Sequence, residues 1–313
     1  MRTVILKIRE LLEYEVKKSI ENGCEGILLS GLDTSILTYI ASKFRSNFKA
    51  FTLKFKNGKD AYYTKKLSQI LNIQHYLFEI KEKELIQNLK ETIKIIGVFE
   101  PIEIRNSVAI YSILKFIKEL GIKGIITGDG ADELFFGYDF LIKMEKNERM
   151  TYAEKMWKRM YFSSVDIGKF LDIKIFTPYL SENFKNYVME IPDNLKIKDN
   201  IGKWILRKSY ENLLPDEFIW RGKEPIEYGS GTTKLTFIFE NKIEDKEFKE
   251  KKEKIRKEDG VIIRDKEHLY YYQIYKEIFG DIRKAKENEI KCRGCGSKIE
   301  YKNAFCRICG TEN

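Results

Sequence analysis

The stretch that decides the fold of this chain is GILLSGLDTSILTYI, residues 26–40. Its first four residues form a short apolar run typical of a buried strand, and the apolar residues of 36–40 recur at helical spacing. The turn formers SGLD lie between them, and Thr34 and Ser35 open the helix. A strand-to-helix turn of this kind can direct backbone N–H groups and the positive end of a helix dipole at a phosphate. The stretch therefore predicts either a phosphate-binding loop or an ordinary strand–helix turn.

Strands and helices alternate along the first 130 residues. Apolar runs predict further strands at 48–55, 74–80 and 122–128, and helical periodicity predicts helices at 4–21, 59–71, 82–96 and 104–120. This alternation predicts an α/β fold with a parallel sheet that carries helices on both faces. Ligands bind such sheets beyond the carboxyl ends of the strands. From about residue 140 to 285 the pattern is mostly helical, and the charge run at 244–260 predicts a solvated helix face or a mobile loop.

Composition narrows the class of protein. The 313 residues are 43% hydrophobic, which suffices for one large or two modest domains. A net charge of +9 favours polyanions such as nucleotides or nucleic acid, although a surface rich in Lys and Glu gives the same balance. No apolar stretch approaches the roughly 18 residues of a membrane helix, and the first 20 residues do not have the pattern of a signal peptide. We therefore expect a soluble, cytoplasmic protein with no membrane partner.

A second motif follows the strand predicted at 122–128. Residues 127–138 read TGDGADELFFGY, which places two glycines, two aspartates and a glutamate within seven residues. Carboxylates beside a phosphate loop are costly unless a metal neutralises them, and Mg²⁺ held by one or two carboxylates and phosphate oxygens meets that need. Asp33 and Asp132 are then the natural pair of ligands. In the alternative interpretation, the acids only complement the dipole at a helix N-terminus.

These motifs resemble those of the synthetase domain of asparagine synthetases, which are ATP pyrophosphatases of the adenine nucleotide α-hydrolase (PP-loop) type. Residues 30–35 read SGLDTS where the family reads SGGLDSS, and residues 128–138 read GDGADELFFGY where it reads GEGSDExFGGY. Residues 100–111, EPIEIRNSVAIY, resemble a segment ending Ile-Arg-Ala-Ser. Residues 203–231 resemble the family's Lys-x-x-Leu-Arg, Leu-Pro and Arg-x-Lys-Glu run. The order is the same throughout, and the resemblance implies one domain over residues 1–285.

The resemblance implies a ligase that activates a carboxylate with ATP. The carboxylate attacks the α-phosphorus, giving an acyl-adenylate and Mg-pyrophosphate, and ammonia or an amine then displaces AMP. Positioning and electrostatics supply most of such catalysis. The implied catalytic residues are Asp129, Lys223 and Arg105. The implied ATP- and pyrophosphate-binding residues are Leu28, Ser30, Gly31, Asp33, Thr34, Ser35 and Gly128, with Asp33 and Asp132 as Mg²⁺ ligands.

The chain departs from the family pattern in three places. The loop at 30–35 has one glycine where the family has two, which changes how closely its backbone can approach pyrophosphate. Arg2 follows Met1 where glutaminase-bearing members have a cysteine. We therefore expect no intrinsic glutaminase, and nitrogen from free ammonia, a separate glutaminase subunit or an amine substrate. Residues 176–181 read FTPYLS where the family reads RxPFLD, so we expect a small carboxylate other than aspartate.

Four of the five cysteines lie in the last 22 residues as two Cys-x-x-Cys pairs, Cys292 with Cys295 and Cys306 with Cys309. Their spacing is typical of a Cys₄ zinc ribbon, which we predict at residues 289–313. So small a unit forms no core unaided, so Zn²⁺ would supply its folding energy. The ribbon would either dock RNA or a partner, or cap the domain. The basic residues that favour RNA are Lys291, Arg293, Lys298, Lys302 and Arg307.

Two other classes of function stay open. A tRNA-modifying ATP pyrophosphatase would adenylate a base carbonyl. Sulfur-transferring enzymes of that kind usually need cysteines near the ATP site, and Cys24 is the one cysteine outside the ribbon, where we expect a small core or loop residue. A non-catalytic nucleotide-binding scaffold is the second alternative, because the phosphate loop is shortened. Release of AMP in the presence of substrates would exclude a scaffold.

Overall fold

The computed structural model describes residues 1–301 and 304–313, and the chain divides into two compact units. Unit 1 consists of Met1–Lys54, Lys59–Phe78 and Ile113–Ser230, and unit 2 of Phe55–Gly58, Glu79–Ser112 and Gly231–Asn313. The chain passes from one unit to the other several times, so neither unit is a continuous piece of sequence. The boundary that the sequence predicts between residues 285 and 289 stays a prediction.

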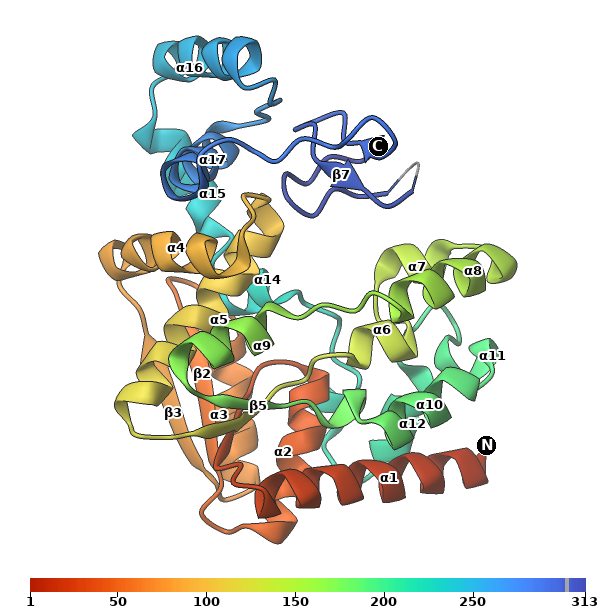
Figure 1. The fold of residues 1–313 in the computed structure, drawn as a ribbon. Helices are drawn as coiled ribbons and strands as arrows, with labels where there is room; N and C mark the ends of the chain where they lie inside the picture. Colours follow the sequence, from red (N-terminus) through yellow and green to blue (C-terminus); the bar gives the residue numbers. More distant parts are fainter. Residues whose placement is uncertain (302–303) are drawn as a thin grey trace. The chain divides into compact units, whose positions relative to one another are not determined.

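A five-stranded sheet forms the centre of unit 1 (Figure 1). Its strands are β1 (Gly26–Leu28), β2 (Lys49–Lys54), β3 (Gln74–Glu79), β4 (Gly124–Ile126) and β5 (Lys174–Phe176), in the order β3-β2-β1-β4-β5. Strand β1 pairs in parallel with both β2 and β4, and β4 pairs in parallel with β5. The two strands that precede the acidic motifs are therefore neighbours, and their carboxyl ends meet at one edge. The predicted α/β fold is confirmed.

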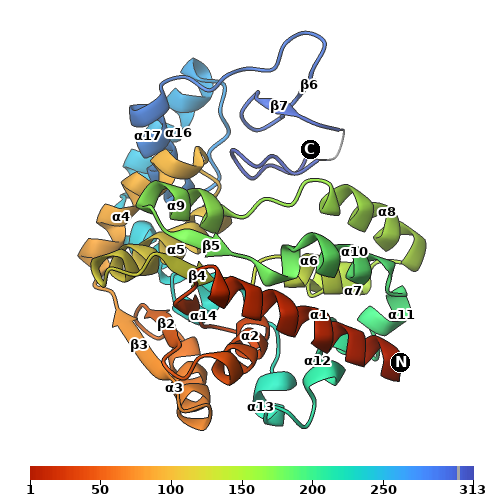
Figure 2. The same ribbon diagram turned by 60° about the horizontal axis from the view of Figure 1, so that its bottom comes forward.

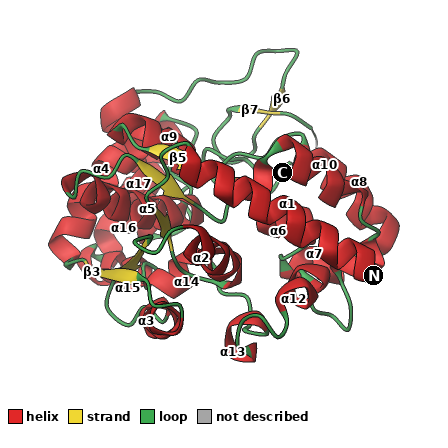
Figure 3. Ribbon diagram, turned by 90° about the horizontal axis from the view of Figure 1, so that it is seen from below, coloured by secondary structure: helices red, strands yellow, loops and turns green. Residues whose placement is uncertain are grey.

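Helices form most of unit 1 around these short strands (Figure 3). They are α1 (Arg2–Glu21), α2 (Leu32–Phe44), α3 (Asp60–Ile70), α6 (Ala131–Phe135), α7 (Asp139–Lys143), α8 (Lys146–Trp157), α9 (Ser163–Leu171), η1 (Pro178–Leu180), α10 (Glu182–Glu190), α11 (Asp193–Lys196), α12 (Trp204–Tyr210), α13 (Asp216–Ile219) and α14 (Ile226–Ser230). Helix α1 packs against α2, α10 and α12 (Figure 2), α3 against β2, and α9 against β5. This packing encloses an apolar core that includes Ile27, Ile36 and Phe135.

Unit 2 is mainly helical. It contains α4 (Glu82–Ile96), the first part of α5 (Pro101–Glu119), α15 (Lys234–Lys242), α16 (Asp245–Glu258), α17 (Lys266–Phe279) and the two short strands β6 (Ile290–Lys291) and β7 (Lys298–Ile299). Helix α17 contacts α4, α15 and α16. On α17, His268 is fully buried and stacks on Phe99, and burial lowers its pKa to about 3. This histidine is therefore a neutral core residue. Helix α16 has no buried residue, which confirms the solvated helix face predicted for the charge run.

Three sequence expectations need correction. Helix α2 begins at Leu32 and not at Thr34, so Asp33 lies in its first turn. Helix α5 begins at Pro101 and not at residue 104, because proline fits the first helical position. Strand β5 lies in the region expected to be mostly helical. It reads KIF and so lacks the apolar run that predicted the equally short β1 and β4, and it pairs with β4.

No described helix is both long enough and apolar enough to span a membrane. Of the described residues that are buried, Lys196 at the end of α11 is unusual because only 1% of its surface is exposed. Its ammonium lies 4.9 Å from the ring centre of Phe136 and 4.8 Å from that of Trp157. Nζ has no hydrogen-bond partner within the described part of the chain. Burial lowers the pKa of Lys196 to about 7, against the opposing charge of Asp193.

This buried lysine makes stability depend on pH. Between pH about 7 and about 10.5 the native state binds fewer protons at Lys196 than the unfolded state does, so the free energy of unfolding should rise with pH. The rise amounts to at most about 1.4 kcal/mol per pH unit. In Lys196→Met it should be lost, and the variant should be the more stable protein at neutral pH. Urea unfolding across this window measures the slope. The exposed Lys198→Met is the control, and equal slopes in all three proteins would contradict the assignment.

Candidate active site

The predicted phosphate loop is the short connection between β1 and α2. The hydroxyl of Thr34 accepts a hydrogen bond from the backbone N–H of Ser30 (2.9 Å) and donates to the carbonyl of Gly31 (3.2 Å). The hydroxyl of Ser35 donates to the same carbonyl (2.8 Å). Both hydroxyls thus hold the loop against the first turn of α2. The first N–H groups of a helix have no intrahelical acceptor, so they are the groups that α2 offers to an anion.

Asp33 and Asp132, the predicted pair, share one ammonium group. Nζ of Lys203 lies 2.5 Å from Oδ2 of Asp33 and 2.8 Å from Oδ1 of Asp132. Nζ of Lys223 lies 2.6 Å from Oδ2 of Asp132. The side chain of Lys203 is 4% exposed, and those of Asp33 and Asp132 are 16% and 19% exposed. Two acids from the first turns of α2 and α6 and two lysines therefore form a half-buried cluster with balanced charge, which we call the Asp–Lys cluster.

Sequence reasoning missed Lys203 as a site residue. Its backbone is left-handed, with φ of 57°, and its N–H donates to the carbonyl of Phe135 (2.9 Å). A left-handed backbone is uncommon for a residue with a side chain and often marks a functional site. The available signal was the first lysine of the Lys-x-x-Leu-Arg run at 203–207, which suggested a family resemblance but no role for this residue.

Two glycines allow the cluster to close. A Cβ atom on Gly137 would lie 2.0 Å from Oδ1 of Asp132 and 2.3 Å from Cε of Lys203. A Cβ atom on Gly128 would lie 3.3 Å from Cβ of Asp33 and 3.0 Å from Cγ2 of Thr34. The glycine at 137 is therefore required by close approach, and the one at 128 lets the two loops pack together.

The cluster is electrostatically able to hold a cation and phosphates. Burial alone would raise the pKa of Asp132, but the ammonium groups of Lys203 and Lys223 lower it to about 2. Burial alone would lower the pKa of Lys203, but the two carboxylates raise it. Oδ1 of Asp33 is buried and accepts no hydrogen bond from the residues that the structure describes. A carboxylate pair with one open oxygen fits Mg²⁺, which keeps most of its ligands as water and phosphate oxygens.

The segment at 221–224, RGKE, holds Lys223 in place. The guanidinium of Arg221 contacts Asp60 (2.7 Å) and Glu224 (2.9 Å), stacks on a tyrosine ring, and donates to the carbonyl of Ser30 (3.4 Å). Arg221 thus ties the segment that carries Lys223 to the phosphate loop. Glycine at 229 makes room for this contact, because a Cβ atom there would lie 2.0 Å from Oδ2 of Asp60.

Asp129 lies close to the cluster but faces two hydroxyls. Its Oδ2 accepts hydrogen bonds from Thr127 (2.7 Å) and Ser164. Burial raises the pKa of Asp129, and both hydroxyls oppose that shift. Sequence reasoning missed Glu133 as a second acid of this kind. Burial, with Asp132 adding to it, raises the pKa of Glu133 to about 7, and the carboxylate accepts a 2.5 Å hydrogen bond from Tyr138.

The predicted acceptor segment at 176–181 follows β5 and reaches the phosphate loop. The hydroxyl of Tyr179 donates to the backbone carbonyl of Asp33 (3.0 Å). Oγ of Ser181 is buried and has no hydrogen-bond partner in the described chain. Leu28 and Gly128, predicted to bind ATP, are half-buried; Leu28 is the last residue of β1 and Gly128 lies two residues after the end of β4.

Arg105 belongs to unit 2 and not to the unit that carries the Asp–Lys cluster. Its Nη1 lies 2.8 Å from Oε2 of Glu267 and 3.1 Å from the hydroxyl of Thr236, and its carbonyl accepts from Thr232 (2.9 Å). The guanidinium is thus held by a buried ion pair. Its predicted catalytic role stays a prediction.

The four C-terminal cysteines converge as a metal site requires. All four are buried, and their sulfur atoms lie within 4.8 Å of one another. The sulfurs of Cys292 and Cys309 are 3.7 Å apart, and those of Cys295 and Cys306 are 3.8 Å apart. A tetrahedral zinc with bonds of about 2.3 Å would set its sulfurs about 3.8 Å apart. The glycines that follow both pairs have φ of 75°, which suits the tight turns predicted there.

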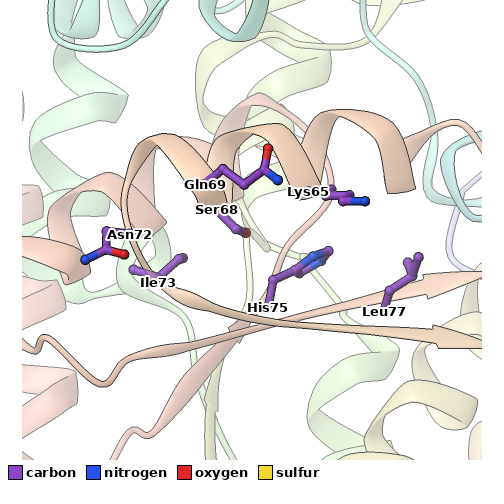
Figure 4. Close-up of a pocket in the computed structure, with 7 residues that line it drawn as sticks. All are labelled: Lys65, Ser68, Gln69, Asn72, Ile73, His75 and Leu77. Carbon is purple, nitrogen blue, oxygen red and sulfur yellow. The ribbon is translucent and has the colours of Figure 1, made fainter.

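A shallow cavity lies elsewhere in unit 1, between α3 and the edge strand β3 (Figure 4). It is lined by Lys65, Ser68, Gln69, Asn72, Ile73, His75 and Leu77. None of these is a predicted site residue and none is an acid, and Nε2 of His75 lies 3.0 Å from the hydroxyl of Thr52. The acids that the sequence predicts as site residues therefore lie at the Asp–Lys cluster and not at this cavity.

Comparison with known proteins agrees with these motifs. The asparagine synthase family model matches residues 7–167 and 172–289. The chain is 27% identical over 304 residues to the glutamine-hydrolysing asparagine synthetase of Gallus gallus, and 27% identical over 303 residues to that of Rattus norvegicus. Each alignment covers 88% of this chain and 53% of the relative, so the chain spans about half the length of these curated relatives. A solved NMN synthetase from Francisella tularensis is similar with a TM-score of 0.33 and 18% identity, over 71% of this chain and 87% of that one.

Removing the shared ammonium should expose the repulsion between the two carboxylates. Lys203→Met should lower the free energy of unfolding by about 2–4 kcal/mol, because breaking a buried pair leaves unpaired charge. Mg²⁺ should restore part of this loss in the variant and add little to the unchanged protein. Urea unfolding with Mg²⁺ or with an equal ionic strength of Na⁺ measures both effects. Lys208→Met is the matched control, since Lys208 pairs with Glu211 on the surface of α12. A variant insensitive to Mg²⁺ would argue against a magnesium site at these acids.

Proposed function

The chain belongs to the asparagine synthase family, and on this premise we propose that it activates a small carboxylate with ATP and joins it to ammonia or an amine. The observation that carries the proposal is the Asp–Lys cluster at the carboxyl ends of β1 and β4. Ligands of open parallel sheets bind at this edge. Carboxylates and ammonium groups side by side are what a Mg-nucleotide requires, because the cation and the phosphates need partners of opposite sign.

The proposed first step is attack of a carboxylate oxygen on the α-phosphorus of ATP. A carbon-bound oxygen forms a bond to this phosphorus, the bond to the bridging oxygen breaks, and pyrophosphate leaves with the electron pair. Lys203 and Lys223 would stabilise the negative charge that develops on the phosphates. Asp33 and Asp132 would hold Mg²⁺, which when bound neutralises the charge of pyrophosphate. The first N–H groups of α2 would orient the phosphates.

The proposed second step is attack of a nitrogen on the acyl carbon, with loss of AMP. An attacking ammonia or amine must lose a proton as the carbon–nitrogen bond forms. Asp129 stands where the family pattern has a glutamate suspected of this role, with the same charge on a side chain one methylene shorter. Glu133 is a second candidate, because its pKa of about 7 suits a group that accepts a proton near neutral pH.

The acceptor segment supports an acceptor other than aspartate. Phe176 and Ser181 replace the arginine and the aspartate of the family pattern, so no charged pair is present there to bind a second carboxylate. The buried, unpartnered hydroxyl of Ser181 is a group that a ligand could satisfy. The nitrogen source would be free ammonia, a separate glutaminase subunit or an amine substrate.

Exchange of labelled pyrophosphate into ATP tests the proposal. The protein is incubated with MgATP and a panel of small carboxylates that includes aspartate, and separately with bulk tRNA. Exchange with one small carboxylate is the expected result, and it establishes an acyl-adenylate. Exchange or AMP release only with tRNA would replace the proposal with base adenylation. No exchange and no AMP release with any acceptor, ammonia being present, would leave a nucleotide-binding scaffold as the better description.

Removing either predicted ligand of Mg²⁺ should abolish turnover. Asp33→Asn and Asp132→Asn should each reduce exchange by at least about 100-fold, because preorganised charge supplies most of the stabilisation in phosphoryl chemistry. Asp139→Asn is the matched control, since Asp139 is exposed and lies seven residues after Asp132. Full exchange activity in either cluster variant would refute the assignment.

We also propose that the four-cysteine site binds one Zn²⁺ ion. Support comes from the spacing of the sulfurs, from their burial, and from two short strands that provide no core of their own.

Metal analysis of the purified protein should find one zinc per chain. Cys292→Ser should lose this zinc, because three sulfurs and a hydroxyl bind it far less tightly. Cys24→Ser should keep it. Cys24 is buried, its thiol donates to the carbonyl of Gly26, and burial raises its pKa to about 12. Equal zinc content in both variants, or a metal-free protein that keeps a folded ribbon, would contradict the zinc site.

A further inference from the structure

The four-cysteine ribbon (residues 289–301 and 304–313 of the described chain) is bound to the rest of unit 2 through both of its Cys-x-x-Cys turns. The carbonyl of Gly294, inside the first turn, accepts a hydrogen bond from the backbone N–H of Ile262 (2.7 Å). The carbonyl of Ile308, inside the second turn, accepts one from the backbone N–H of Phe99 (2.9 Å). The metal ligands of each turn flank the acceptor carbonyl, so the geometry of the metal site sets the position of both contacts.

The second turn also reaches the start of α5. Glu100 accepts a hydrogen bond from the backbone N–H of Glu103 (2.6 Å), which caps this helix as an N-terminal acid does. A Cβ atom on Gly310 would lie 2.4 Å from Cγ of Glu100, so the ribbon packs directly on the capping side chain. Arg264 joins the two, because it donates to the carbonyl of Gly310 (2.6 Å) and lies 3.5 Å from Oε1 of Glu100.

The first turn is tied to a third segment. Nζ of Lys284 donates to the carbonyls of Cys295 (3.0 Å) and Asp259 (2.6 Å). The backbone N–H of Ala285 donates to the carbonyl of Gly296 (2.9 Å). The ribbon therefore connects three segments that are distant in sequence, namely residues 99–100, 259–264 and 284–285.

The basic residues of the ribbon are mostly engaged inside unit 2. Arg293 donates to the carbonyl of Glu312 (2.8 Å), and Lys298 pairs with Glu289 (3.0 Å). Burial raises the pKa of Glu103 in α5, and the positive charge of Arg307 opposes that shift. Lys302 lies outside the described residues.

We propose that the metal-loaded ribbon is a clamp that fixes the first turns of α5, so that the segment from Phe99 to Ser107 is ordered only when the four cysteines hold their ion. This inference rests on the zinc site proposed above and is independent of the proposed reaction. Without the ion, a unit of this size has no core to hold its turns. The carbonyls of Gly294, Ile308 and Gly310 then lose their positions, and the cap of α5 loses its support. Arg105, one turn further along α5, is the residue whose position depends on this clamp.

Hydrogen exchange of the full chain tests the clamp. The zinc-loaded and the chelated proteins are compared by mass spectrometry, with zinc content measured in each. Backbone exchange over residues 99–107 should become at least about tenfold faster after chelation, because local opening free energy falls with lost contacts. Residues 26–40 of unit 1 should be unchanged. The separate zinc measurement distinguishes failure of the clamp from failure of the metal site.

A pair of variants separates the clamp from the metal. Arg264→Ala keeps all four cysteines, so it should retain one zinc per chain and still show faster exchange over 99–107. Arg293→Ala is the matched control, because its guanidinium donates to the carbonyl of Glu312 within the ribbon. Unchanged exchange over 99–107 in both the chelated protein and Arg264→Ala would overturn the proposal. Unchanged exchange together with loss of tRNA binding on chelation would replace it with an RNA-docking role.

Discussion

The ammonium of Lys203 between Asp33 and Asp132 is the interaction on which the candidate site depends. Two half-buried carboxylates from the first turns of α2 and α6 repel each other, and the pairing is stable only because an ammonium lies between them. That ammonium comes from a residue 170 positions away in sequence from Asp33. It reaches the acids through a left-handed backbone and across a glycine that leaves no room for a side chain. The positions of the two acids, the left-handed backbone of Lys203 and the balance of charge in the cluster therefore depend on one another.

A second set of contacts supports the first. Arg221 joins Asp60, Glu224 and the carbonyl of Ser30, so that the segment carrying Lys223 cannot move independently of the phosphate loop. Unit 2 also holds together segments that are distant in sequence. There, three segments contact the small four-cysteine ribbon, and the proposed zinc site would fix the positions of those contacts.

The features that could be predicted from the sequence are those that short stretches of residues determine. Strands β1 to β4 and the helices between them carry clear apolar periodicity, and the cysteine spacing is a local motif, so the fold class and the convergence of the four sulfurs are confirmed. The pairing of Asp33 with Asp132 was predictable because neighbouring parallel strands end at one edge. Strand β5 was missed because it begins with a lysine and lacks the apolar run that predicted the equally short β1 and β4. Lys203 and Glu133 were missed because the properties that single them out, a left-handed backbone and a burial-shifted pKa, arise only from tertiary contacts.

The balance of charge suggests which ligands would bind together at the Asp–Lys cluster. The two carboxylates and two ammonium groups of the Asp–Lys cluster sum to zero. Mg²⁺ alone would leave an excess positive charge beside Lys203, and a nucleotide alone would leave an excess negative charge beside Asp33, both in a half-buried place where unbalanced charge is costly. Adding the two together halves the excess negative charge that the nucleotide alone would leave, and the positive end of α2 offsets part of the remainder. At the proposed site, the charge of the cluster and the positive end of α2 would therefore favour binding of the metal together with the nucleotide.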